Sequence, residues 1–125
     1  HCADTPADMD VGAADIRRWH VDERGWDDLG YHWIVRRSGQ LEPGRDQRLQ
    51  GSHALAVNSK SIGVCLVGRG DNFTEDQMYT LHNVIQTIKD MHPEIEVIGH
   101  SDVEPKKPHC PGFNVKEWYQ DEFIG

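Results

Sequence analysis

The segment IGVCLVG, residues 62–68, is the feature of this sequence that most restricts its fold. Every residue in it is apolar or glycine, so neither face of an extended chain would carry a polar side chain. Strands with one solvent-exposed face alternate polar and apolar residues, whereas strands covered on both faces are continuously apolar. We therefore expect a buried strand, central in its sheet, with Cys65 as a small hydrophobic residue of the core.

Two elements are predicted before this strand. Residues 12–24 carry apolar side chains at helical spacing and stop at Gly25, a residue suited to the left-handed conformation that ends helices. Residues 31–37 alternate in character, and Ser38-Gly39 follows them as a turn. These patterns predict a surface helix and then a β-hairpin.

Three elements are predicted after the strand. Thr74 and Gln77 form the signature of a capping box and open an apolar stripe, which indicates a long helix. Residues 94–100, EIEVIGH, are expected to form another strand, and Asn114 is expected to cap a short last helix. Helices that interleave with strands around a hairpin predict an α+β fold with a mixed central β-sheet flanked by helices.

Length and charge limit the possible functions. A chain of 125 residues has the size of one domain, so we expect a single domain over residues 1–125, with a further strand preceding His1. The 21 acidic and 13 basic residues give a net charge of -8, which argues against nucleic acid as a partner. No apolar run approaches the roughly 20 residues that span a bilayer, so no membrane insertion is expected.

Histidine and cysteine residues stand at both ends of the chain and could meet in the fold. His100 closes the predicted strand, Cys110 follows a loop rich in proline and lysine, and His1 opens the sequence. Two imidazoles and a thiolate suit zinc and leave a fourth tetrahedral position for water, as in catalytic sites. The alternative is a surface histidine and a buried thiol, which spacing alone favours. Cys2 should point away from His1 and join the core.

Nine motifs, in one order along almost the whole chain, resemble those of zinc-dependent N-acetylmuramoyl-L-alanine amidases, also called amidases of type 2. They are HCADTP, IRRWH with GW, GYHWIVRRSG, GRDQ, GSHA, NSKSIGVCLVG, FT, GHSDVEPK and CPGF. The chain is similar to the peptidoglycan recognition proteins too. This resemblance implies a mixed sheet flanked by helices, with zinc in a surface cleft.

The resemblance also implies roles for individual residues. One Zn²⁺ per chain would be bound by His1, His100 and Cys110, and the family's catalytic tyrosine falls on Tyr31. The family positions that match His53 and Asn58 line the substrate groove, although the two residues could equally be plain polar residues of a loop. The remaining histidines are interpreted as structural residues without a catalytic role: His20, His32, His82 and His92.

The sequence departs from the family pattern at the catalytic lysine. The family has a lysine two residues before the ligand cysteine, but that position holds Pro108, and the segment PKKPHC is longer by two residues. Lys106 follows a proline as in the pattern, whereas Lys107 lies nearer the cysteine, and we favour Lys107. His109 stands beside Cys110, which remains the better match to the metal ligand.

The activity implied by the resemblance is hydrolysis of the amide between the lactyl group of N-acetylmuramic acid and L-alanine of the stem peptide. A phage or prophage endolysin fits best: a monomer kept in the host cytoplasm before release, with no export signal in the sequence, that acts on peptidoglycan in the periplasm. The alternative is a protein of the same fold that only binds peptidoglycan or regulates RNA polymerase, a contact suggested by analogy alone.

Overall fold

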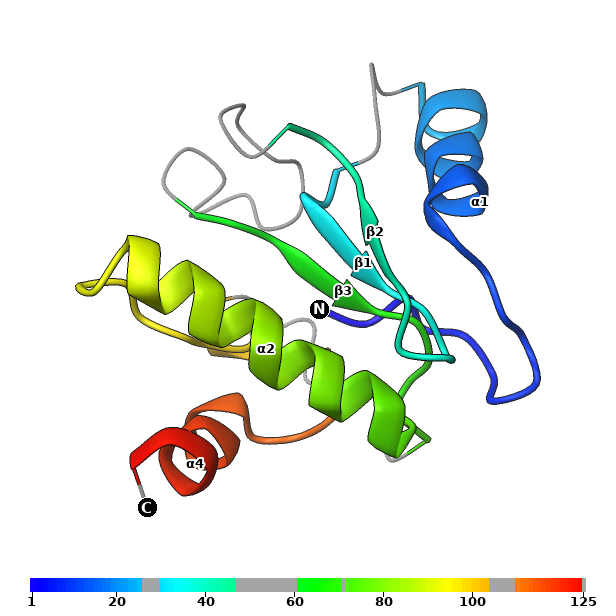
Figure 1. Cartoon of the computed structure of the whole chain (residues 1–125). Coiled ribbons are helices and arrows are strands. Elements are labelled where there is room, and N and C mark those ends of the chain that lie inside the picture. The colour runs from blue at the N-terminus through cyan, green and yellow to red at the C-terminus, as the bar shows by residue number, and fades with distance from the viewer. Residues whose placement is uncertain (26–29, 47–60, 71, 104–109, 125) are drawn as a thin grey trace.

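A mixed three-stranded sheet lies at the centre of the molecule (Figure 1). The computed structural model describes residues 1–25, 30–46, 61–70, 72–103 and 110–124. The strands are β1 (Trp33–Val35), β2 (Leu41–Pro43) and β3 (Val64–Leu66), in the order β2-β1-β3. Strand β1 pairs antiparallel with β2 and parallel with β3, which confirms the mixed sheet of an α+β fold.

The hairpin between β1 and β2 forms where the turn residues predicted it. The Arg36 N–H donates to the Gln40 carbonyl at 2.9 Å, and the Gly39 N–H donates to the Arg36 carbonyl at 2.8 Å. Gly39 has a φ of 89°, a left-handed conformation that glycine adopts without steric cost. The turn sets the register in which Val35 faces Leu41.

Strand β3 is covered on both faces, as its apolar run predicts. Cys65 packs with Ile34 on the face that also holds Ile16, whereas Leu66 packs with Val35 on the opposite face. Cys65 and Ile34 are fully buried. Strand β1 is the middle one of the three named strands, but β3 also has backbone partners on both of its sides, as expected of a central strand. Beyond β3, an isolated parallel bridge joins Leu66 to the residue Cys2.

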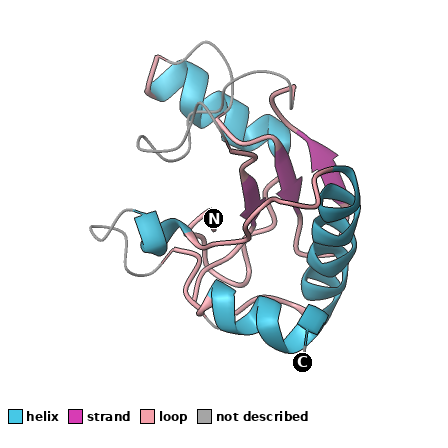
Figure 2. Cartoon of the chain, turned by 90° about the vertical axis from the view of Figure 1, so that its left-hand side faces the viewer, coloured by secondary structure: helices cyan, strands magenta, loops and turns pink. Residues whose placement is uncertain are grey.

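Helices cover both faces of this sheet (Figure 2). Helix α1 (Ala13–Arg18) runs on into the π-helical segment η1 (Trp19–Glu23), as predicted for residues 12–24. Helix α2 (Glu75–Met91) begins with the predicted capping box, in which the Thr74 hydroxyl accepts from the Gln77 N–H at 3.1 Å. None of the helices in the described ranges is long and apolar enough to cross a bilayer.

The buried Gln77 side chain joins α2 to the sheet. Its Nε2 donates to the Val67 carbonyl at 2.7 Å and to the Val35 carbonyl at 3.2 Å, while its Oε1 accepts from the Thr74 N–H at 2.9 Å. These bonds satisfy polar groups that water cannot reach, since Gln77 is 0 % exposed.

The strand predicted at residues 94–100 does not form. This segment has no regular structure as far as residue 99, and His100 begins a short helix, α3 (His100–Val103), instead of ending a strand. Two of its hydrogen bonds are local: the Ile95 carbonyl accepts from Lys89 Nζ at 2.6 Å, and the Gly99 N–H donates to Asp102 at 2.8 Å. Residue types that favour strands form one only beside a partner, and no described strand pairs with this segment.

The chain ends in the predicted short helix. Asn114 caps α4 (Val115–Tyr119) by accepting from the Glu117 N–H at 3.0 Å, and the π-helical segment η3 (Gln120–Ile124) continues from it. Trp118 and Phe123 pack against the apolar cluster on the α2 side of the sheet. The last helix, α4, therefore covers the same face of the sheet as α2.

Candidate metal centre

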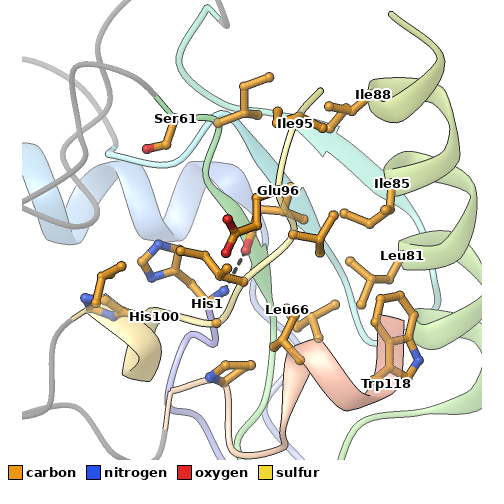
Figure 3. Close-up of a pocket in the computed structure, with 18 of the residues that line it drawn as sticks. His1, Ser61, Leu66, Leu81, Ile85, Ile88, Ile95, Glu96, His100 and Trp118 are labelled. Atoms are coloured by element: carbon orange, nitrogen blue, oxygen red, sulfur yellow. Dashed lines mark hydrogen bonds between the residues drawn. The ribbon is translucent and has the colours of Figure 1, made fainter. Parts of the chain in front are cut away.

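Three side chains that lie far apart in the sequence converge at one end of β3. A nitrogen of His1, a nitrogen of His100 and the Cys110 sulfur all lie within 4.8 Å of one another. The His1 and His100 rings are 4.4 Å apart between centroids (Figure 3), and Cys110 Sγ is 4.0 Å from His1 Nδ1. Ligand atoms around one tetrahedral zinc are about 3.3–3.8 Å apart, so a small inward shift would let all three bind one ion.

Backbone hydrogen bonds of His1, and of Ser101 with Cys110, position this group. The His1 backbone nitrogen donates to the Val64 carbonyl, and the Leu66 N–H donates to the His1 carbonyl, each at 2.9 Å. The Ser101 N–H donates to the Cys110 carbonyl at 2.9 Å, which ties α3 to the segment after residue 109. The edge of β3 and the start of α3 thus supply the frame of the group. All three side chains are half-buried, which leaves them within reach of solvent.

Cys2 contacts the Cys110 sulfur, an arrangement that strand alternation in the sequence does not predict. Cys2 is buried as expected, but its sulfur lies 3.7 Å from Cys110 Sγ, and its backbone N–H donates to that sulfur at 3.3 Å. Hydrogen bonding from the Cys2 side chain lowers the pKa of the Cys110 thiol, while the same bond and burial raise the pKa of Cys2. Cys110 is therefore the thiolate of the pair, the form that a metal binds.

Tyr31 lies beside this group, two residues before β1 begins at Trp33. Its ring centroid is 5.1 Å from that of His1 and 5.6 Å from that of His20. Burial, with a smaller contribution from nearby thiolates, raises the pKa of Tyr31 well above 10. The phenol is therefore a neutral hydrogen-bond donor at neutral pH.

Two buried histidines fix the backbone near the candidate centre. His20 Nδ1 accepts from the Gly30 N–H, and His32 Nδ1 accepts from the Gly63 N–H, each at 2.9 Å. Burial, then the charge of Arg24, lowers the pKa of His20 to about 4. Both contacts agree with the structural role predicted for these histidines. The position of His20 next to Tyr31 could not be read from the sequence, because their contact depends on how η1 packs.

The other candidate residues of the sequence analysis lie outside the described residues. These are Lys106, Lys107, His53 and Asn58. Their predicted roles stay predictions.

A cavity of about 440 Å³ opens beside His1 and His100. Figure 3 shows these two residues on one side of it, facing Leu81, Ile85 and Ile88 of α2. Trp118 and Leu66 contribute further apolar surface. Besides the two histidines, the polar side chains of the lining are those of Ser61, Glu94 and Glu96, and the rest of its walls are largely apolar.

These features define the class of the protein. Residues 1–113 match the family described as N-acetylmuramoyl-L-alanine amidase, and the chain belongs to this family. Among individual proteins, it is 46 % identical to the endolysin of Enterobacteria phage K11, with 94 % of this chain and 81 % of the relative covered.

Solved structures agree with this assignment. The amidase LysC of Clostridium intestinale is 26 % identical, with a TM-score of 0.84 over 98 % of this chain and 80 % of the other. Bumblebee PGRP-SA is 24 % identical, with a TM-score of 0.83 over 99 % of this chain and 78 % of the other, and it shares the fold.

Proposed function

We propose that this protein is a zinc-dependent peptidoglycan hydrolase of a phage or prophage. It would cleave the amide between the lactyl group of N-acetylmuramic acid and L-alanine of the stem peptide. The observation that carries this proposal is the convergence of His1, His100 and Cys110 within 4.8 Å in a chain of the amidase family. The similarity to a phage endolysin supports the biological setting, release from the host cytoplasm to act on the cell wall in the periplasm.

The donor set fits zinc. Two imidazoles and one thiolate form a borderline-soft site of three protein ligands, which leaves a fourth position open. When bound, zinc lowers the pKa of a coordinated water to about 7 and polarises the substrate carbonyl. The single negative charge of the thiolate would only partly neutralise the two positive charges of the ion. The site would therefore keep a net positive charge, which stabilises a developing oxyanion.

Tyr31 acts as a hydrogen-bond donor in this proposal. Its neutral phenol lies on the His1 side of the group and can donate to the oxygen that becomes negative as the amide carbonyl is attacked. Lys107, or Lys106 in its place, would stabilise the same charge. His53 and Asn58 would contact glycan or peptide.

The proposal is tested on purified peptidoglycan. The zinc-loaded protein should release new N-terminal L-alanine, a chelator should stop the release, and added Zn²⁺ should restore it. Metal analysis should find about one zinc per folded chain. A folded, zinc-loaded sample that releases no N-terminal L-alanine would overturn the catalytic function and leave peptidoglycan binding as the remaining activity.

A further inference from the structure

The three cysteines have different surroundings. Cys65 is 0 % exposed and packs in the core of the sheet, with its sulfur 3.8 Å from the Leu66 carbonyl. Cys2 and Cys110 instead have their sulfur atoms 3.7 Å apart, although 108 positions separate them in the chain. The fold has therefore brought a second thiol, with no role in the proposed reaction, against the sulfur of the candidate metal ligand.

This contact is held from both sides. Cys2 is fixed by its parallel bridge to Leu66, and the Ala3 N–H donates to the Leu66 carbonyl at 2.9 Å. Cys110 is fixed through its carbonyl by Ser101 and through its sulfur by the Cys2 N–H. A disulfide bond is about 2.0 Å long, so the sulfur atoms would have to approach by about 1.7 Å. Side-chain rotation and a small backbone shift can provide a movement of this size.

We propose that Cys2 and Cys110 form a reversible disulfide when the metal site is empty, so that oxidation switches the metal centre off. The proposal rests on the proposed role of Cys110 as a ligand. If the Cys110 sulfur is in a disulfide, it is no longer a thiolate and cannot bind zinc. If it is bound to zinc, it cannot form a bond with the Cys2 sulfur. The two states exclude each other because they use the same atom.

The chemistry needs a two-electron oxidant, and a peroxide supplies it. The half-buried Cys110 sulfur attacks one peroxide oxygen, the O–O bond breaks, and a sulfenic acid forms with release of water. The Cys2 sulfur then attacks the Cys110 sulfur, the S–O bond breaks, and a second water leaves with the Cys2 proton. Two thiols and one hydrogen peroxide give one disulfide and two waters, and a dithiol reductant reverses the change.

The switch is tested on metal-free and zinc-loaded protein treated with one equivalent of hydrogen peroxide. In the metal-free protein, the number of reduced thiols should fall from three to one, and non-reducing peptide mapping should link Cys2 to Cys110 and leave Cys65 reduced. This sample should lose zinc uptake and regain it after dithiothreitol. The zinc-loaded protein should keep its thiols under the same treatment.

Two variants serve as controls. Cys2→Ser keeps all three candidate ligands and should bind zinc but give no linked peptide. Cys65→Ala should still form the link and fall from two thiols to none. The inference is overturned if the metal-free protein gives no Cys2–Cys110 link, if zinc-loaded protein forms it equally well, or if the linked protein still takes up zinc. None of these results depends on amidase activity, so the experiment distinguishes a failure of this inference from a failure of the proposed function.

Discussion

The sheet core and the candidate metal centre are built in different ways. Around β3, neighbouring residues alternate between two apolar clusters, so that Cys65 and Leu66 are each buried by the helix on their own side. At the metal centre, the three candidate ligands come from both ends of the chain and meet only through the edge of β3 and the start of α3. The core follows from the local pattern of apolar residues, whereas the candidate metal centre depends on contacts between residues far apart in the sequence.

This difference predicts that the two regions can be damaged separately. A change in the core should lower the free energy of unfolding and leave the chemistry of the remaining folded molecules intact. A change at the centre should remove activity and zinc with little effect on the sheet. Three substitutions and one pH dependence test this separation, given in order of decreasing expected effect.

Cys110→Ser should have the largest effect. A serine hydroxyl is a poor zinc ligand at neutral pH, so we expect zinc affinity and amidase activity to fall at least about 100-fold. The circular dichroism spectrum of the metal-free variant should match that of the metal-free wild-type protein. The matched control is Cys2→Ser, which changes the neighbouring thiol and should keep bound zinc and activity. A Cys110→Ser protein that keeps its zinc would contradict the ligand assignment.

Tyr31→Phe should come next. The change removes one hydroxyl and keeps the ring beside His1, so kcat should fall about 100-fold if the phenol stabilises the oxyanion. Zinc content and the free energy of unfolding should stay close to the wild-type values. Equal activity of the two proteins under saturating peptidoglycan would show that the phenol has no part in the chemical step.

The same difference explains which features the sequence could predict. The hairpin, α2 and α4 follow from turn residues and caps that act within a few positions, and each forms where expected. The strand at residues 94–100 was predicted from residue type, but a strand also needs a neighbour in space, and this segment lacks one among the described strands. The absence of this strand shows that a local pattern of residue types does not by itself determine strand pairing.

The candidate site shows the same limit. Residue type suggests a zinc site at His1, His100 and Cys110, but spacing alone favours a surface histidine and a buried thiol, and the family resemblance decides between these two interpretations. Strand alternation predicts the direction of the Cys2 side chain but not which distant segment packs against it. The contact between Cys2 and Cys110 spans 108 positions and has no local signal in the sequence.

Gln77→Leu tests the core side of the comparison. The change leaves the Val35 and Val67 carbonyls without the amide that now donates to them in a buried site. We expect the free energy of unfolding in urea to fall by about 2–4 kcal/mol. Activity and zinc per folded molecule should be unchanged well below the melting temperature. Loss of zinc from the folded variant would show that the core and the centre are coupled.

The smallest effect should come from the protonation of His20, which lies between the two regions. Its pKa in the folded protein is about 4, below the ordinary value of 6.5, because the ring is buried. Between these values the unfolded chain binds more protons than the folded one, so the free energy of unfolding should fall as the pH drops from about 6.5 to 4. The loss attributable to this residue is on the order of 1–3 kcal/mol.

Urea unfolding of metal-free protein at pH 7 and pH 4.5 measures this loss. His20→Asn keeps an acceptor near the position of Nδ1 for the Gly30 N–H but cannot be protonated in this range, so its stability should depend less on pH. His32→Asn is the matched control, because His32 Nδ1 accepts from the Gly63 N–H in the same way as His20 Nδ1 accepts from the Gly30 N–H. If His20→Asn shows the full wild-type pH dependence, another group causes it. If His20→Asn also lowers kcat while His32→Asn does not, the backbone before Tyr31 connects the core to the centre.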